Sequence, residues 1–212
     1  MRLKKYIHAT PSMRITMIRS AWRRLVTRLY YRLIFQGIGK RSILYANVIA
    51  INSEFIRIGN SVTIRSGSRL EVILHDQNWV PRMEIGSNVN IEQNVHIVCH
   101  DQVLIGDNVS IAPMCAIVDT KHPYDVCREG KKIGAAISSE RSAVVIGANT
   151  FLGVGVTVLP GVTVGENCVI GAGSVVTRDL PVGSIAAGIP AKVIGNVFLV
   201  PDEEQADDGD RR

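Results

Sequence analysis

A six-residue period runs through most of this 212-residue chain and limits what it can fold into. Its most regular stretch, residues 146–181, reads IGANTF-LGVGVT-VLPGVT-VGENCV-IGAGSV-VTRDLP. A helix repeats every 3.6 residues and a strand every two, so neither alone sustains a period of six. A coil of short flat sides does, because each side points one aliphatic residue inward and ends in a tight turn. The leading aliphatic residues are Ile146, Leu152, Val158, Val164, Ile170 and Val176.

A larger period shows how the sides group into coils. The phrase aliphatic-Gly-x-Asn begins at Ile85, Ile105, Ile146 and Val164. The last two starts lie 18 residues apart, which is three sixes, and the first two lie 20 apart. The longest gap, 41 residues, contains the unpatterned stretch 123–145. The sequence therefore predicts an all-β stack of 18-residue coils with one extruded loop, and with Gly and Asn at corners that require positive φ.

Composition sets further limits on the class of protein. Aromatic residues make up only 5% of the chain, which suits a narrow aliphatic core. The four cysteines show no C-x-x-C spacing, so we expect free, mostly buried thiols in a reducing compartment and no zinc site. No signal-peptide pattern occurs in residues 1–41, and no apolar run approaches the ~20 residues of a spanning helix. A cytoplasmic location is therefore expected. The cysteines are Cys99, Cys115, Cys127 and Cys168.

Charge divides the chain into three segments. Residues 1–41 hold eight Arg and three Lys and no acidic residue, although the whole chain is only +5. Residues 42–197 carry the repeats and are predicted to form the β-helix. Residues 198–212 are rich in Asp and Glu and are expected to be a disordered tail.

The basic segment predicts an amphipathic helix of about six turns, with Ser12 as N-cap and Gly37 and Gly39 as stops. One interpretation is a lid over the open end of the β-helix, where edge backbone groups need cover. The other is an interfacial helix, residues 12–36, attracted to anionic lipid at the inner face of the cytoplasmic membrane. The two roles can coexist, and no nucleic-acid partner is expected. Its apolar residues are Ile15, Ile18, Trp22, Leu25, Leu29 and Leu33.

Two motifs make the repeat specific. Residues 105–125 read IGDNVSIAPMCAIVDTKHPYD, and residues 160–195 read PGVTVGENCVIGAGSVVTRDLPVGSIAAGIPAKVIG. With them the chain resembles the hexapeptide-repeat acyltransferases over roughly residues 58–195. Within that family it is most similar to the maltose, galactoside and polysaccharide O-acetyltransferases. The resemblance implies a left-handed parallel β-helix, although right-handed crossovers are the general rule. It also implies acetyl-CoA as co-substrate and a homotrimer. A loop as long as 123–145 is rarely kept without a function, so we expect it to reach the adjoining subunit.

The resemblance implies that His122, of the His-Pro pair, is the general base. Transfer of an acetyl group from a thioester to a sugar hydroxyl requires one, and histidine changes its protonation near neutral pH. Its second ring nitrogen must be held, by a backbone carbonyl or by Asp119, of which we favour the carbonyl. The backbone amide of Val154 is the implied oxyanion donor. The acceptor oxygen is expected to attack directly, so Cys115 and Cys127 are not nucleophiles.

One departure from the family concerns the acceptor. Glu92 stands where the maltose and galactoside branch has an acceptor-binding asparagine, with Asn94 close by. Asp119 and Asp125 complete the expected acceptor-binding set. That branch's small amino-terminal domain is also lacking here. Both points favour a polysaccharide or lipid-linked sugar precursor as the acceptor.

The implied acetyl-CoA site lies along the later coils. Small residues keep the wall low, and two cations match positions that contact the phosphates in the family. For Phe151, a packing role is an equal alternative to a contact with the cofactor. The alternative for the two cations is that they are solvated surface charges. The residues are Phe151, Gly153, Gly171, Ala172, Arg178, Ala187 and Lys192.

Three other functions are alternatives for a repeat of this kind. A zinc site of the gamma-type carbonic anhydrases needs three histidines, but the pair His96 and His100 precedes His122 and none follows, so no metal is expected. His8 and His75 are interpreted as surface or structural residues. An amino-sugar N-acetyltransferase would share the fold and co-substrate. A non-catalytic solenoid scaffold is the third possibility, but it leaves the His-Pro motif unexplained.

Overall fold

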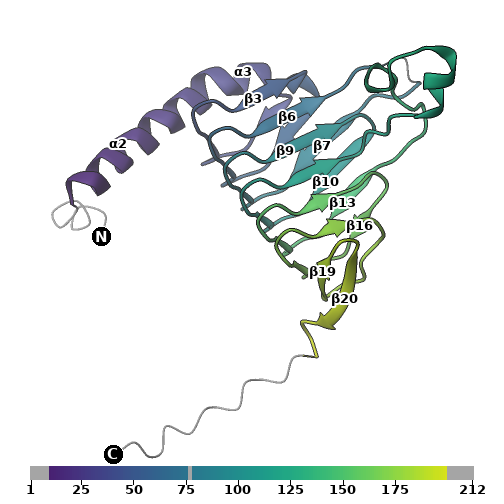
Figure 1. Cartoon of the computed structure of the whole chain (residues 1–212). Helices are drawn as coiled ribbons and strands as arrows, with labels where there is room; N and C mark the ends of the chain where they lie inside the picture. The colour runs from purple at the N-terminus through teal and green to yellow at the C-terminus, as the bar shows by residue number, and fades with distance from the viewer. Residues whose placement is uncertain (1–9, 76–77, 200–212) are drawn as a thin grey trace, which may run out of the picture.

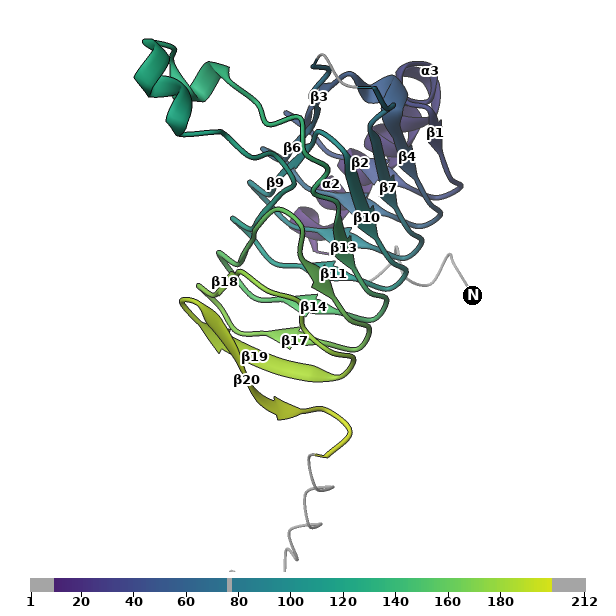
Figure 2. The same ribbon diagram turned by 90° about the vertical axis from the view of Figure 1, so that its right-hand side faces the viewer.

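The computed structural model describes residues 10–75 and 78–199. The predictions for His8 and for the tail beyond residue 199 lie outside these residues. The chain winds into a stack of coils with three sides, narrowing toward the C-terminal end (Figure 1). A helix lies at the wide end, and a long loop projects from the side of the stack (Figure 2).

The three sides are three sheets, in which neighbouring strands are parallel except for the last pair. Sheet 1 contains β1 (Gly37–Ile38), β4 (Ile56–Ile58), β7 (Arg82–Ile85), β10 (Gln102–Ile105), β13 (Val144–Ile146) and β16 (Thr163–Val164). Sheet 2 contains β2 (Ile43–Leu44), β5 (Thr63–Ile64), β8 (Asn90–Ile91), β11 (Ser110–Ile111), β14 (Phe151–Leu152), β17 (Val169–Ile170), β19 (Ser184–Gly188) and β20 (Ala191–Asn196). Sheet 3 contains β3 (Ile49–Ile51), β6 (Arg69–Val72), β9 (His96–Cys99), β12 (Ala116–Val118), β15 (Thr157–Val158) and β18 (Val175–Val176).

The register of sheet 1 confirms the predicted repeat. The first residues of the aliphatic-Gly-x-Asn phrases lie opposite one another, and all are buried: Ile85, Ile105, Ile146 and Val164. Their side chains join one continuous core cluster. The coil with a 20-residue spacing carries its extra pair where sheet 3 turns into sheet 1, at His100 and Asp101.

The recurring asparagines form a ladder at the corners between sheets 1 and 2. Asn88, Asn108 and Asn149 all have φ of 59°, a left-handed conformation that asparagine tolerates better than most residues. The Asn88 amide donates to Asn108 Oδ1 at 2.8 Å, and the Asn108 amide donates to Asn149 Oδ1 at 3.0 Å. The asparagine of the repeat therefore fits the corner and also bonds the next coil.

The amino-terminal helix comprises α2 (Pro11–Val26), the π-helical turn η1 (Thr27–Tyr31) and α3 (Arg32–Ile34). Its N-cap is Thr10, whose side chain accepts from the Met13 amide at 3.3 Å. The predicted cap at Ser12 is wrong, because Pro11 already occupies the first turn, where proline is favoured. The first coil starts at Gly37, before the predicted boundary at residue 42, since Gly37 and Ile38 pair with β4.

Only the C-terminal end of this helix covers the coil. Thr27 is buried, and its hydroxyl accepts from the Leu44 amide at 2.9 Å, which satisfies an edge group of the first coil. Phe35 is buried in the core, with Tyr31 and Ile34 packed against it. Residues 27–35 therefore form a lid, whereas α2 has no buried side chain. Within the described residues, no helix is long and apolar enough to cross a membrane.

The extruded loop ends two residues earlier than predicted. Val144 and Val145 belong to β13, where they pair with Val103 and Leu104, because the alternation of inward and outward side chains already begins there. Short 3-10 turns within the loop are η3 (Asp125–Glu129) and η4 (Ile133–Ala135), and another, η2 (Ser53–Phe55), ends the first coil.

Candidate active site

The predicted site residues fall on two edges of the stack. We call the line of corners between sheets 2 and 3 the 2/3 edge, and that between sheets 3 and 1 the 3/1 edge. At about 3.3 Å per residue, a six-residue side spans roughly 20 Å, so groups on the two edges of one chain cannot meet. The 2/3 edge holds Glu92, Asn94, Gly153, Val154, Gly171, Ala172 and, where β19 ends, Ala187. The 3/1 edge holds Asp119, His122, Asp125 and Arg178.

His122 is exposed at the start of the loop on the 3/1 edge. Its Nδ1 lies 2.7 Å from the carbonyl oxygen of Ala136. A carbonyl oxygen only accepts hydrogen bonds, so this contact requires a hydrogen on Nδ1 and leaves the Nε2 lone pair able to take a proton. Of the two predicted partners for the ring, the structure shows the backbone carbonyl.

An open pocket of about 640 Å³ surrounds this histidine. Asp125 and Arg128 line it together with His122, so a carboxylate and a cation stand ready to contact a polar ligand. The other lining residues are Lys121, Pro123, Tyr124, Ser138 and Glu140. A larger hollow of about 810 Å³ runs along the outer face of sheet 1, and no histidine lines it.

The loop arms are paired at their base. The Ser138 amide donates to the Lys121 carbonyl at 2.9 Å, and the Ser142 hydroxyl donates to the Asp119 carbonyl. With the contact of His122 to the returning arm, these bonds form a ladder that holds the base of the loop.

Asp119 does not serve the acceptor. Its side chain is fully buried, and its carboxylate accepts from the backbone amides of His100 at 2.5 Å and Asp101 at 2.8 Å. Burial raises the pKa of this carboxyl to about 6. The prediction of acceptor binding is wrong here, because the two inserted residues present amides that need a buried acceptor.

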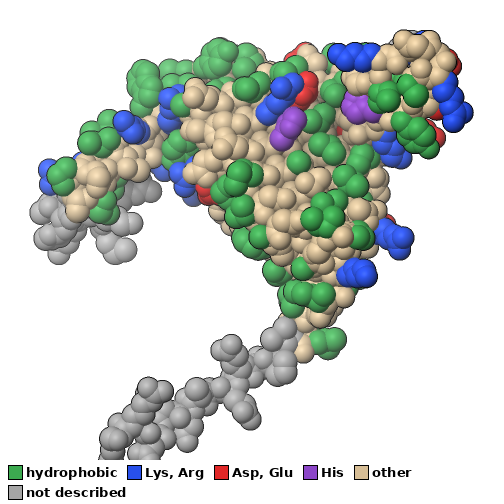
Figure 3. Space-filling view, viewed as in Figure 1, with side chains coloured by type: hydrophobic (Ala, Val, Ile, Leu, Met, Phe, Trp, Pro, Cys, Tyr) green, Lys and Arg blue, Asp and Glu red, His purple; other side chains and the backbone are tan. Residues whose placement is uncertain are grey.

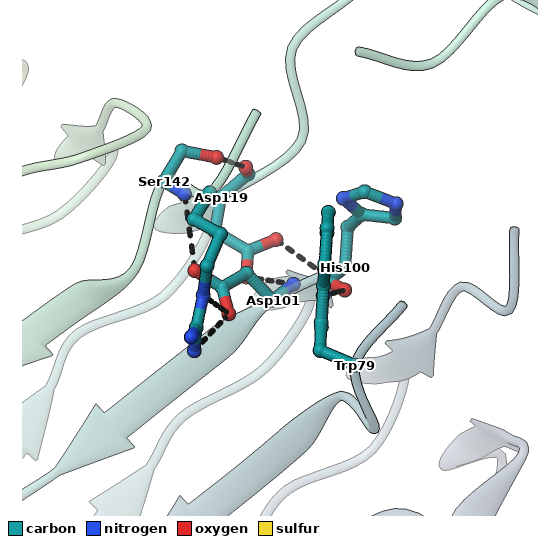
Figure 4. A network of polar contacts seen from close by, with 6 residues as sticks. Trp79, His100, Asp101, Asp119 and Ser142 are labelled. Carbon is teal, nitrogen blue, oxygen red and sulfur yellow. Dashed lines mark hydrogen bonds and ion pairs between the residues drawn. The ribbon is translucent and has the colours of Figure 1, made fainter. Parts of the chain in front are cut away.

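Asp101 anchors the returning arm of the loop (Figure 4). It is 1% exposed, and its Oδ1 lies 2.9 Å from a terminal guanidinium nitrogen of Arg141. Its Oδ2 accepts from the Ser142 amide at 3.1 Å. Sequence reasoning missed this network, and the only signal for it was the 20-residue spacing.

His100 completes the network as a packed side chain. Its ring centroid lies 5.5 Å from that of Trp79 and 6.2 Å from that of His75. Burial, followed by the nearby His75, lowers the pKa of His100. His96 stands on sheet 3, and burial and then Arg69 lower its pKa. Nowhere in 10–75 and 78–199 do three or more His, Cys, Asp or Glu side chains gather as metal ligands would.

On the 2/3 edge, the Val154 amide points to no partner. The neighbouring amides of Gly153 and Gly155 donate to Ile170 and Pro113 carbonyls at 2.9 and 3.0 Å, whereas no hydrogen bond to another described residue uses the Val154 N–H. The corresponding amides in other coils, at Ser66, Gln93 and Ala172, are also unused within the described part of the chain. An available donor is therefore a general property of this turn.

The glycines assigned to the cofactor have a structural reason. A Cβ on Gly153 would lie 2.7 Å from the Ala172 amide, and one on Gly171 would lie 3.0 Å from the Ala187 Cβ, so the coils could not stack as closely. On the described 2/3 edge, the glycines that leave open space are Gly155 and Gly173, both with φ of 70°. These two keep the 2/3 edge low.

The other predicted cofactor residues lie at three different places. Phe151 is exposed on the flat face of sheet 2, between Ser110 and Val169. Lys192 pairs with Ala187 in the β19–β20 hairpin, whereas the exposed Arg178 is on the 3/1 edge. The two cations therefore lie on different parts of one chain.

The predicted acceptor residues of the 2/3 edge are accessible. The carboxylate of Glu92 lies 3.6 Å from the Arg65 guanidinium, and both side chains are partly exposed. Asn94 is exposed, with φ of 57°.

Comparison with known proteins agrees with this architecture. The family model for the bacterial transferase hexapeptide (six repeats) matches residues 143–178. The galactoside O-acetyltransferase of Escherichia coli K12 is 44% identical over 115 residues, 54% of each chain, so this chain spans about half the length of that relative. An E. coli K12 protein assigned by name to lipopolysaccharide biosynthesis, the O-acetyl transferase WbbJ, is 33% identical over 80% of this chain and 83% of its own.

Solved structures share the fold. AntD, an N-acyltransferase from Bacillus cereus in complex with dTDP and 3-hydroxybutyryl-CoA, has a TM-score of 0.69 at 19% identity, covering 80% of this chain and 87% of its own. PerB from Caulobacter crescentus, in complex with CoA and GDP-perosamine, has a TM-score of 0.52 at 26% identity, covering 82% and 66%. The stacked hexad coils and these relatives place the chain among the β-solenoid acyltransferases. The chain belongs to the hexapeptide-repeat acyltransferase family, as its motifs predicted.

Proposed function

We propose that this protein is an acetyl-CoA-dependent O-acetyltransferase that acts on a polysaccharide or lipid-linked saccharide precursor in the cytoplasm. The observation that carries the proposal is the geometry of His122. Its Nδ1 contacts a carbonyl, its Nε2 is free to act as a base, and it opens on a polar pocket. Relatives named as O-acetyltransferases of galactoside and of lipopolysaccharide biosynthesis support the reaction class.

In this mechanism, Nε2 of His122 removes the proton of the acceptor hydroxyl as its oxygen attacks the thioester carbonyl. The C–O bond forms, the carbon–sulfur bond breaks, and the CoA thiolate leaves and takes up a proton. The Val154 amide donates to the oxyanion, a contact worth about 2.7–4 kcal/mol in comparable sites. General base catalysis by a positioned histidine contributes about 10²–10⁴-fold.

The separation of the two edges implies that a complete site is shared between two copies of the chain. His122 and Val154 lie on different edges of one chain, so a complete site requires the 3/1 edge of one copy against the 2/3 edge of another. Repeated head to tail, this contact closes into a ring, and we propose a homotrimer with the left-handed coil of the family. The loop then helps to wall the acceptor site, where Asp125 and the partner's 2/3 edge contact the sugar.

The first test is calorimetric titration of the wild type and of His122→Ala with acetyl-CoA. Binding by both, followed by acetyl transfer from the wild type alone to one of a panel of saccharide hydroxyl acceptors, would support the proposal. Failure of the wild type to bind would favour the scaffold. Amino sugars belong in the panel, because AntD and PerB are named for N-acyl transfer or bind an amino sugar nucleotide. Preferred acetylation of an amine would establish the N-acetyltransferase instead.

A second test addresses the shared site. Val154→Pro removes one N–H, and the corresponding corner of another coil already holds Pro113, so the turn should persist. Ser66→Pro, at the same corner of an earlier coil, is the matched control. Co-expression of His122→Ala with Val154→Pro should restore activity, since mixed trimers contain sites with both wild-type groups. No restoration from purified mixed trimers would place both groups in one chain's site and reject this assembly.

The phosphate role of Lys192 has its own test. Lys192→Glu should weaken binding of coenzyme A more than that of pantetheine, which lacks the nucleotide phosphates. Equal losses for the two ligands would assign this lysine to the surface. The role proposed for Arg178 can be tested in the same way with Arg178→Glu.

A further inference from the structure

A stripe of large apolar side chains runs along the amino-terminal helix on the side that faces away from the coil. Thr27, the buried contact with the coil, lies two residues before Leu29, which places the two about 160° apart around the helix. Ser20, whose hydroxyl lies 3.3 Å from that of Tyr45, is also on the coil side. The stripe consists of Ile15, Ile18, Trp22, Leu25, Leu29 and Leu33.

Within the described chain most of this stripe is uncovered, although Trp22 also lines a hollow with Tyr45 and Arg65 of the first two coils. Ile18 is 69% exposed, Trp22 60%, Leu29 61% and Leu33 82%. Figure 3 shows hydrophobic side chains gathered along the outward side of the helix. Contiguous exposed apolar surface of this kind marks an interaction site. The lid contacts the coil through other side chains, those of Thr27, Tyr31, Ile34 and Phe35, so the stripe has no role in closing the coil.

The charges beside the stripe indicate what covers it. Residues 10–36 contain no Asp or Glu, and their arginines are Arg14, Arg19, Arg23, Arg24, Arg28 and Arg32. Arginine stems lie along apolar surface while the guanidinium extends to phosphate groups. A second copy of the same helix would bring six more cations and no anion to balance them. An apolar stripe flanked by arginines matches the acyl chains and headgroups of an anionic membrane.

We propose that α2 and α3 lie flat on a membrane surface that contains anionic lipids, with the apolar stripe among the acyl chains. Residues 27–35 are fixed to the first coil through Thr27 and Phe35. The helix therefore holds the whole coil stack at the surface. This proposal does not depend on acetyl transfer, and its test uses no acceptor.

The experiment is co-sedimentation of the full-length protein with vesicles of phosphatidylcholine, with and without phosphatidylglycerol. We expect binding to the anionic vesicles at low salt and its loss on screening by high salt. Arg19→Gln with Arg24→Gln and Arg28→Gln should weaken the partition on the order of 100-fold, at about fivefold per arginine. Ile18→Ser with Leu29→Ser should weaken it at least about tenfold. Val80→Ser, which changes an equally exposed valine elsewhere, is the control and should have no effect.

Trp22 gives a readout that sedimentation does not. In a Trp79→Phe background it is the remaining tryptophan of the chain, and its emission should shift to the blue on anionic vesicles. Absence of binding at low salt, or equal binding to phosphatidylcholine alone, would overturn the proposal. The proposal would also be overturned if the Ile18→Ser, Leu29→Ser protein bound vesicles as the wild type does but had a lower assembly mass. That result would assign the stripe to contacts between copies.

Discussion

The later coils and the 3/1 edge of the third and fourth coils are built from the same repeat, but they bury different chemistry. In residues 144–180 the buried side chains are aliphatic or small, such as Val158, Leu152 and Ser174. At the 3/1 edge the chain buries two carboxylates and an imidazole, those of Asp101, Asp119 and His100. The two regions differ by a short insertion and a loop.

The comparison shows what an insertion does to a stacked repeat. In the regular coils the strand amides, and most of those at the corners, donate to a neighbouring coil, so hydrophobic packing can fill the interior. Two extra residues at one corner leave amides with no coil above or below them in register. Asp119 accepts from both amides, and Asp101 then ties the returning arm of the loop to the same corner. The irregular corner thus holds the returning arm of the loop, whose Ala136 carbonyl contacts His122.

The largest effect should come from the loop itself. His122→Ala should lower the rate of acetyl transfer about 10²–10⁴-fold, because it removes the proposed base. The free energy of unfolding should hardly change, since the side chain is exposed. Initial rates with saturating acetyl-CoA, and urea unfolding, measure the two. His96→Ala is the control, and an equal loss of rate there would contradict the assignment.

Substitutions in the core of the regular coils should lower the free energy of unfolding. Ile146→Ala should lower the free energy of unfolding by about 2–5 kcal/mol, because it leaves a cavity in the central column. Val145→Ala, in the same strand but pointing outward, should cost less than about 1 kcal/mol. Urea unfolding at one protein concentration compares them, since an oligomer's stability depends on concentration. Similar losses for both variants would mean that the column is not the main source of stability.

The fold could be predicted because the same six-residue pattern recurs many times along the chain. A single misplaced Ile or Gly would not hide a period repeated over residues 146–181, and the sequence also located the loop to within a few residues. Boundaries such as Gly37 were missed because β1 has only two residues, and nothing in their chemistry distinguishes a strand from a linker. The family was confirmed by the match of the hexapeptide-repeat model and by a relative that is similar over most of the chain.

The site could be predicted only in part. The sequence does not show that His122 and Val154 lie on different edges of the stack. That follows only from the three-dimensional position of each corner. Asp119 is predicted to bind the acceptor, whereas its partners in the structure are amides of residues inserted earlier in the chain. Contacts between backbone groups of different coils leave no pattern in side-chain types.

The titration of Asp119 gives a smaller effect. Its pKa is raised from 3.8 in the unfolded chain to about 6 in the fold. The folded state therefore binds the proton more tightly, and this stability is fully present below the unfolded pKa and lost as the pH rises through about 6. Compared with Asp119→Asn, which does not titrate, the wild type should lose at most about 3 kcal/mol between pH 4 and 7. Parallel urea midpoints for the two proteins across this range would contradict the raised pKa.

The smallest effect separates positioning from stability at the irregular corner. Arg141 is 60% exposed although its partner Asp101 is 1% exposed, so solvent screens the pair and Arg141→Gln should cost only about 1 kcal/mol of stability. Because Arg141 fixes the arm on which His122 rests, acetyl transfer should nevertheless slow several-fold, with the KM for acetyl-CoA unchanged. Arg128→Gln is the control, because Arg128 is in the same loop but does not contact Asp101. It leaves the Arg141–Asp101 pair intact and tests whether loop charge in general affects kcat. If Arg128→Gln slowed transfer as much as Arg141→Gln, charge in the pocket rather than the tie to Asp101 would govern the histidine.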